Sequence, residues 1–211
     1  RGVVQGPAPQ ALGSINEQGK YAQLPESENE VKAIVNLFED RGSKHSTLAL
    51  RQWANENSLK ENLSKSYQFI HIAGHSFANL ENPKFSGIAC FDDEEGDGED
   101  GVLYTGEIYN ISTQADLVTL SSCESGYGKL ELTEGMLGLN RAFIYAGTPN
   151  VVFSLWKVYD KVSSQLMVDF YQQILAGKSY AASLREAKLK LLNQEATAAP
   201  HYWGPYLLIG R

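Results

Sequence analysis

Apolar runs of strand length alternate with stretches of helical periodicity along most of the chain. Runs at 67–75 and 115–123 stop at glycine-containing turns, which is typical of short buried strands, and two further runs, at 151–156 and 205–209, are also predicted to be strands. Helical spacing of apolar residues occurs in three further segments: 133–146, 161–176 and 179–193. This alternation predicts an α/β fold with a mostly parallel central sheet and helices on both of its faces.

Two helices are also expected before the first strand. Ser27 and Glu30 form a capping-box pattern ahead of an amphipathic segment, and Gly42 follows as a stop signal. A second helical stretch is expected over 48–64, with a break near Asn55 and Asn57. The first ordered element is therefore expected to be a helix rather than a strand.

Composition separates the N-terminal stretch from the rest of the chain. Residues 1–23 are rich in Gly, Pro, Gln and Ala without periodicity, which favours a flexible linker or a processed segment. Residues 24–211 are expected to form one domain, because 43% hydrophobic content in a chain of 211 residues can bury one substantial core. The chain is expected to be the C-terminal part of a longer protein.

The segment between the first two strands has the pattern of a hairpin. Short apolar runs at 87–91 and 102–104 flank an acidic, glycine-rich loop at 92–101, and Thr105 is placed to cap a short helical turn. The carboxylates of this loop lack the spacing of an EF-hand. A solvated loop is therefore favoured over an ion site.

Charge and composition restrict the function classes. The 18 basic and 25 acidic residues give a net charge of −7, which argues against binding of nucleic acid or of an anionic membrane. No apolar segment approaches the roughly 20 residues that cross a bilayer, and the first residues lack the apolar core of a signal peptide. The chain is therefore expected to be soluble and cytoplasmic, where a reducing environment keeps a thiol free.

A thiol and an imidazole stand at the ends of two predicted strands. Cys123 ends one apolar run and His75 ends another, so both are expected on loops at strand ends, where parallel-sheet proteins carry out chemistry. Their separation of 48 residues (123 − 75) is close to the roughly 50 residues found in caspase-type peptidases. A histidine within hydrogen-bond reach can deprotonate the thiol, and the thiolate can attack a carbonyl carbon.

The negative oxygen of the resulting tetrahedral intermediate needs N–H donors. The backbone N–H of Cys123 is one candidate. The N–H of Ser76, expected on the turn after His75, is the other. Together they would form an oxyanion hole.

Other reactive residues have simpler interpretations. Cys90 lies within an apolar run, which favours a structural role, and His71 is interpreted as a hydrogen-bonded core histidine. Zinc binding by His71, His75 and Cys123 is disfavoured, because two histidines four residues apart in an extended strand lie about 13 Å apart. No Gly-x-Ser-x-Gly motif and no phosphate-binding loop occur, so serine hydrolase and nucleotide hydrolase functions are disfavoured.

Several sequence motifs occur in a fixed order along the chain. They are 69–75, Asp100-Gly101 with 105–108, 115–124, 134–139, 154–158 with Asp160, and 202–206 followed by 208–210. In this order they resemble the motifs of CHAT domains, which are caspase-like peptidases of bacteria, often fused to tetratricopeptide repeats. The resemblance covers about residues 24–210.

The resemblance implies the caspase-haemoglobinase fold and a catalytic dyad of His75 and Cys123. It implies cleavage of a protein substrate through a thioester acyl-enzyme, commonly in bacterial defence or regulated cell death, without a metal or an organic cofactor. It also suggests that Ser154, Leu155 and Trp156 line the cleft and that a substrate strand pairs with this segment. A plain core position for Trp156 is an equal alternative.

Two departures from the family pattern bear on the site. The position after the histidine is usually glycine, and here it is Ser76. Basic-residue-cutting relatives often carry aspartate two positions before the cysteine, where this chain has Ser121, although Asp160 could supply a charge. No arginine lies beside either catalytic motif, which disfavours aspartate before the cut. A neutral or basic residue is expected there.

Two other functions are compatible with the same residues. A catalytically silent scaffold or interaction module would keep the fold and an inert dyad. A cysteine acyltransferase or transpeptidase would use the same dyad and pass the acyl group to an amine. Retention of both His75 and Cys123 favours the endopeptidase.

Overall fold

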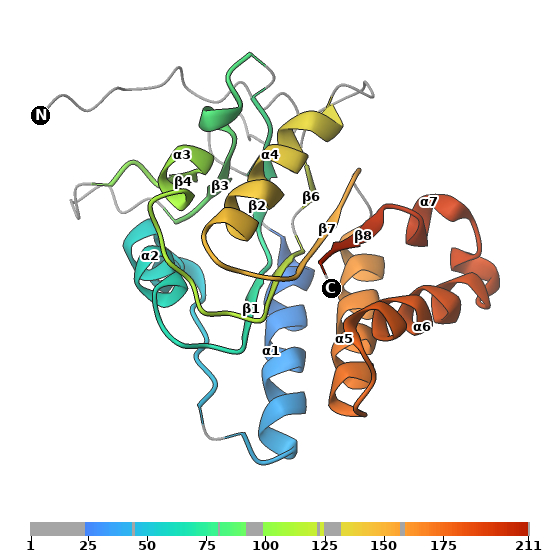
Figure 1. Cartoon of the computed structure of the whole chain (residues 1–211). Helices are drawn as coiled ribbons and strands as arrows, with labels where there is room; N and C mark the ends of the chain where they lie inside the picture. The colour runs from blue at the N-terminus through green and yellow to red at the C-terminus, as the bar shows by residue number, and fades with distance from the viewer. Residues whose placement is uncertain are drawn as a thin grey trace, which may run out of the picture.

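The computed structural model describes residues 24–43, 45–79, 81–91, 99–121, 123–124, 132–156 and 159–210. The linker expected over 1–23 and most of the acidic loop lie outside the described residues. The helices are α1 (Pro25–Asp40), α2 (Glu56–Leu63), α3 (Thr105–Ile108), α4 (Leu132–Tyr145), α5 (Asp160–Leu175), α6 (Tyr180–Leu192) and α7 (Pro200–Trp203). Figure 1 shows how they surround the strands.

Eight strands are assigned among the described residues, in two sheets. They are β1 (Phe69–Ile72), β2 (His75–Phe77), β3 (Gly87–Ala89), β4 (Val102–Tyr104), β5 (Leu117–Leu120), β6 (Cys123–Glu124), β7 (Val151–Ser154) and β8 (Tyr206–Ile209). The central sheet has the order β1-β5-β7-β8, parallel except for β8. The second sheet has the order β4-β3-β2-β6, in which only β2 and β6 are parallel.

The two sheets are connected by a bend in two neighbouring strands. Strand β1 leads into β2 through residues 73–74, and β5 leads into β6 through residues 121–122. The Ser121 N–H donates to the Ile72 carbonyl at 2.9 Å, so the two chain segments stay paired at the bend. The prediction of one unbroken strand over 67–75 is therefore wrong, because the backbone turns at Gly74 before His75.

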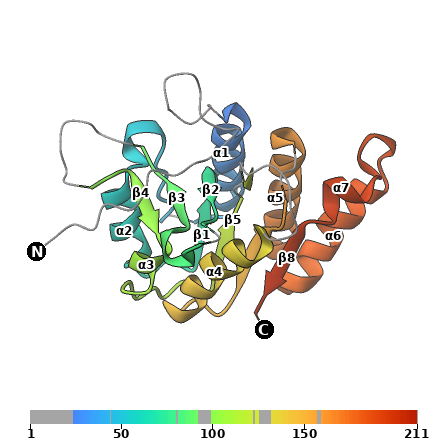
Figure 2. The same ribbon diagram turned by 90° about the horizontal axis from the view of Figure 1, so that it is seen from above.

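Successive residues of strand β5 contribute to two different cores. Leu117 lies in an apolar cluster with side chains of α1, α5 and α6, whereas Val118 and Leu120 lie in a cluster with side chains of α2 and α4. Figure 2 shows α4 on the opposite side of the strands from α1 and α5. The predicted α/β fold, with a mostly parallel central sheet and helices on both faces, is confirmed.

Helix α1 begins earlier than its capping-box pattern predicted. Its N-cap residue is Leu24, with Pro25 in the first turn, where proline costs no hydrogen bond and its fixed φ suits the helix. Ser27 lies inside that turn, and its hydroxyl donates to the Leu24 carbonyl at 2.7 Å. The predicted capping box is wrong, because the Glu30 carboxylate is buried and binds His71 instead.

The helix expected over 48–64 is shorter in the structure. A 3-10 turn at Arg51–Trp53 precedes α2, and Trp53 is exposed. The predicted break is confirmed at Asn55, since the Asn55 side chain caps α2 by accepting the Ser58 N–H at 2.8 Å. At Asn57 it is wrong, because Asn57 lies inside α2.

The hairpin predicted between 87 and 104 is confirmed as strands β3 and β4. The cap predicted at Thr105 is wrong, because the Thr105 hydroxyl donates to the Ser86 carbonyl at 2.9 Å. The Glu107 carboxylate instead accepts the Tyr104 N–H at the start of α3.

Among the described residues, no helix combines the length and the apolar character needed to cross a bilayer.

Three described helices end at glycines in the left-handed region of backbone space, and one of them is α1, which ends before Gly42 (φ +89°) as its stop signal predicted. Gly147, after α4, has φ +117°, and Gly177, after α5, has φ +85°. A Cβ on Gly147 would lie 2.6 Å from the Thr113 carbonyl oxygen, whereas a Cβ on Gly177 would meet nothing within 4 Å. A side chain at either position would strain the backbone, and at Gly147 it would also clash with the Thr113 carbonyl.

We predict that Gly147→Ala lowers the free energy of unfolding more than Gly177→Ala does. The left-handed conformation alone costs about 1 kcal/mol in Gly177→Ala. Displacement of the Thr113 backbone should add about 2 kcal/mol in Gly147→Ala. Urea unfolding monitored by circular dichroism measures both variants, and equal losses would contradict the close approach.

Candidate active site

Strands β2 and β6 place His75 next to Cys123. The two strands pair in parallel, with His75 opposite Cys123 and Ser76 opposite Glu124. Paired Cα atoms of neighbouring strands lie about 5 Å apart. Two residues that are far apart in the sequence are therefore direct neighbours across one pair of strands.

Ser76 occupies a strand rather than the turn expected after the histidine. It is fully buried and lies opposite Ile88 of β3 as well as Glu124 of β6. The turn at Gly74 precedes His75, so the expected order of histidine and turn is wrong. Because backbone N–H groups of a strand lie in the plane of its sheet, the Ser76 N–H points towards a neighbouring strand.

The first turn of helix α5 lies against the ends of these strands. The hydroxyl oxygens of Ser121 and Ser163 are 3.3 Å apart, and both side chains are buried. Asp160, in the same turn, accepts the Glu26 N–H of α1 at 3.0 Å. The start of α5 is thus held by α1 on one side and by the bend after β5 on the other.

Asp160 also interacts electrostatically with His75. Burial raises the pKa of the Asp160 carboxyl, and the carboxylates of Glu30 and Glu26 add to this rise. The Glu26 N–H and the His75 imidazole act in the opposite direction. Asp160 therefore belongs to the charge environment of the histidine.

The segment expected to line the cleft follows strand β7. Ser154 is buried and lies opposite Tyr206 of β8, and the Leu155 N–H donates to the Pro205 carbonyl at 3.0 Å. Trp156 is 40% exposed, and its indole N–H donates to the His201 carbonyl at 3.1 Å. A plain core position for Trp156 is therefore wrong.

His71 lies in the core and is hydrogen-bonded through Nε2, as the sequence predicted, whereas its buried Nδ1 has no hydrogen-bond partner among the described residues. Its Nε2 is 2.7 Å from the Glu30 carboxylate of α1, and its ring packs edge-on against Tyr171 of α5. The Tyr171 hydroxyl donates to Thr119, which lies opposite His71 on strand β5. These contacts tie helices α1 and α5 to the strands just before the bend.

Glu30 is the residue of this region that the sequence patterns did not identify. Its position near a helix start suggested a cap, although its spacing from the helical apolar residues places it on the buried face with Ile34.

The second cysteine is an unreactive thiol. Burial raises the pKa of Cys90 to about 12, so the thiolate is scarce at neutral pH. The thiol donates weakly to the Ile88 carbonyl at 3.8 Å. This environment supports the structural role predicted for Cys90.

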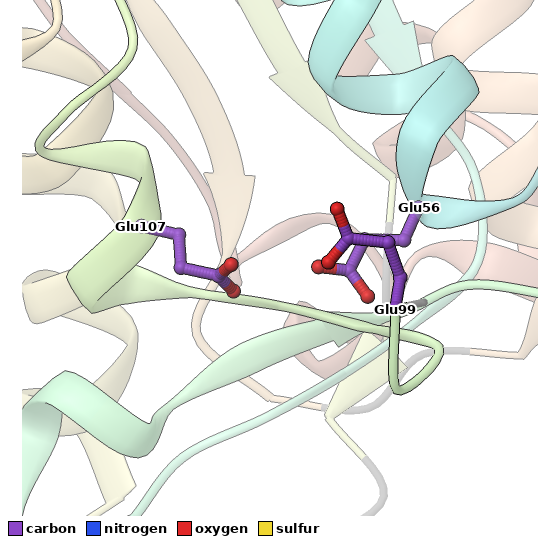
Figure 3. Close-up of side chains that lie close together, drawn as sticks. All are labelled: Glu56, Glu99 and Glu107. Carbon is purple, nitrogen blue, oxygen red and sulfur yellow. The ribbon is translucent and has the colours of Figure 1, made fainter. Parts of the chain in front are cut away.

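Three glutamates converge behind the hairpin. Carboxylate oxygens of Glu56, Glu99 and Glu107 lie within 4.8 Å of one another, and Figure 3 shows the side chains directed towards a common centre. The Lys60 ammonium contacts all three, at 2.7 Å from Glu56, 2.9 Å from Glu99 and 2.8 Å from Glu107. The lysine thus supplies the positive charge that such a cluster needs, and we call the four residues the Lys60 cluster.

The Lys60 cluster attaches the β3–β4 hairpin to α2. Glu56 accepts the N–H of Val102 at the start of β4, while Glu99 precedes β4 and Glu107 lies in α3. Strand β3 of this hairpin pairs with β2, where Ala89 lies opposite His75. The cluster therefore stabilises β3, the strand that pairs with β2 and lies next to His75.

Comparison with known proteins gives two kinds of match. The family model for the CHAT domain matches residues 3–211. Tetratricopeptide repeat protein 28 of Mus musculus is 31% identical over 109 residues, which are 52% of this chain and 4% of that protein. The protein of the same name from Homo sapiens is 30% identical over 109 residues, with the same shares. The chain spans a small part of the length of these relatives.

We predict that Lys60→Met destabilises the fold by about 3 kcal/mol at pH 7, because three carboxylates, one of them buried, lose their cation. Burial already raises the pKa of Glu56, and loss of Lys60 removes the main interaction that lowers it. When the pKa of a carboxyl is raised in the folded state, the folded protein becomes more stable as the pH falls through that pKa and the carboxyl is protonated. The loss in free energy of unfolding caused by Lys60→Met should therefore be smaller at pH 5 than at pH 7.

Lys32→Met is the matched control, because Lys32 forms an exposed pair with Glu28 on α1. Its effect on urea unfolding should be small at both pH values. A Lys60→Met loss that is no larger than that of Lys32→Met, or that does not change with pH, would contradict the role of the Lys60 cluster.

Proposed function

The chain belongs to the CHAT domain family, a family of caspase-like peptidases, and on this premise we propose that it is a cysteine endopeptidase with a dyad of His75 and Cys123. The observation that carries the proposal is the register of strands β2 and β6, in which these two residues are direct partners. Residues paired across neighbouring strands direct their side chains to the same face of a sheet. The proposal therefore brings imidazole and thiol together on one face.

In the proposed reaction, the His75 imidazole takes the Cys123 proton, and the thiolate attacks the carbonyl carbon of the scissile peptide bond. The imidazolium then protonates the leaving amine, which leaves a thioester on Cys123. Water, deprotonated by the same imidazole, hydrolyses the thioester and releases the acid. The backbone N–H groups of Cys123 and Ser76 are the proposed oxyanion donors. For Ser76 this requires that the substrate carbonyl take the place of the group in a neighbouring strand that accepts its N–H.

The substrate is proposed to bind as an extended strand along residues 154–156. Exposure of Trp156 next to the end of β7 supports a contact with substrate side chains. Ser121 is proposed to border the pocket for the residue before the cut, although its hydroxyl is directed to Ser163 of α5. Asp160 is proposed to supply the negative charge of that pocket, which favours a basic residue there.

The biological setting is also a proposal. The relatives named for tetratricopeptide repeats support an associated repeat region, which would regulate the peptidase. We propose action in the cytoplasm, where the Cys123 thiol stays reduced, in defence or regulated cell death. The matched relatives are mammalian, so the proposal of a bacterial setting rests on the motif resemblance.

A catalytically silent interaction module is the second candidate. The observation that favours it is the burial of Ser76 between two paired strands, where the family usually has glycine. A donor that stays bonded within the sheet would leave the oxyanion with the Cys123 N–H alone. Removal of one oxyanion donor typically costs 10²–10³ in rate.

We predict that Cys123→Ala and His75→Ala each reduce peptide-bond cleavage by at least about 10³-fold, because nucleophile and base act as a unit. Cys90→Ala is the matched control and should keep most of the activity, since that thiol is partly buried and its pKa is raised. Cleavage of an unfolded protein substrate is followed by mass spectrometry, which also separates hydrolysis from transfer to an added amine. Undiminished cleavage by Cys123→Ala would exclude the proposed nucleophile.

We also predict that Asp160→Asn removes a preference for arginine or lysine before the cut. A series of fluorogenic peptides that differ only at this residue measures the preference as a ratio of kcat/KM values. The ratio of arginine to alanine substrates should fall by about tenfold or more, as expected for loss of a charged partner. An unchanged ratio would assign the pocket charge to another residue.

A further inference from the structure

An apolar groove lies between α6, α7 and β8. Its volume is about 420 Å³. Its lining is mostly apolar and includes one lysine: Leu184, Lys188, Leu189, Leu192, Trp203 and Leu208. Leu192 is 39% exposed, so the apolar wall is open to an incoming side chain. The groove has no part in the peptidase reaction proposed above.

Lys188 is the polar feature of this groove. Burial by the surrounding apolar side chains lowers the pKa of its ammonium group, and no charged neighbour offsets this effect. Among the residues that the structure describes, no carboxylate lies within 4.0 Å of it, whereas Lys190 on the same helix pairs with Asp169. Arg185, whose guanidinium contacts the exposed Glu186, adds a second positive charge to the lining. Lys188 is partly exposed, and a carboxylate placed in the groove would pair with its ammonium and offset the partial burial.

The position of the groove indicates the shape of its occupant. Helices α1, α5 and α6 pack side by side, and α6 is the last of this layer among the described helices (Figure 1). The groove runs along the outer side of α6, next to β8, which is the last described strand of the central sheet. A further helix placed there would continue the layer and cover Leu192 and Leu208.

We propose that this groove is a docking site for an amphipathic helix of a protein partner. Leucine-sized side chains at helical spacing fill the groove, and a glutamate or aspartate between them pairs with Lys188. The charge fixes the orientation of the partner helix, while the apolar contacts supply most of the affinity. The groove could bind a partner helix whether or not His75 and Cys123 are catalytic, so the proposal does not rest on the peptidase function.

The probe is a fluorescent synthetic helical peptide of about 18 residues, with leucines at i, i+3, i+4 and i+7 and one glutamate among them. Fluorescence anisotropy measures its binding to the whole chain, beside a second peptide in which glutamine replaces the glutamate. The glutamate peptide should bind about tenfold more tightly than the glutamine peptide. Lys188→Met, which keeps the length of the side chain, should abolish that difference.

Two variants and one alternative probe complete the test. Lys178→Met, at an exposed lysine outside the groove, should leave binding unchanged, and Leu192→Glu should abolish it for both peptides. Equal binding of the two peptides, insensitivity to Lys188→Met, or no binding at about 1 mM would overturn the proposal. Binding of phosphatidylserine vesicles with the same dependence on Lys188 and Leu192, in place of the peptide, would overturn it in favour of a lipid surface.

Discussion

The parallel pairing of β2 with β6 is the constraint on which the proposed chemistry depends. This pair is short among the described residues, where β6 comprises Cys123 and Glu124. Its register is inherited from the longer pair β1 and β5, because the two strands bend together and stay bonded through Ser121 and Ile72. Since a slip by one residue would move every side chain to the other face, the core positions of β1 and β5 also determine which residue lies opposite His75.

Buried polar contacts stabilise this arrangement from both sides. Glu30 and His71 attach α1 to β1 just before the bend, and Asp160 joins α5 to α1 beside His75. On the other side, the Lys60 cluster holds the hairpin that pairs with β2. Each of these contacts joins elements that are distant in sequence. The site therefore depends on the completed fold, and we expect loosening of α1 or of the hairpin to reach the dyad.

Local patterns predicted the elements well and their long-range contacts poorly. Apolar periodicity identified the strands, the helices and the parallel sheet, because burial follows these patterns directly. It missed the bend before His75, because the apolar pattern gives no information on how the backbone turns at Gly74. It also misread Glu30, since a carboxylate near a helix start can cap that helix or pair with a distant histidine. His75 and Cys123 were expected on loops at strand ends, whereas the structure places them at the starts of β2 and β6, and their register required the three-dimensional structure.

The proposed chemistry depends on activation of the Cys123 thiol by His75. The most direct test is the rate of alkylation of each cysteine by iodoacetamide at neutral pH, determined by mass spectrometry for the unaltered chain and for His75→Ala. We predict that Cys123 reacts at least about tenfold faster when His75 is present, while Cys90, which is partly buried and has a raised pKa, reacts slowly in both. Equal rates at Cys123 with and without the imidazole would contradict it.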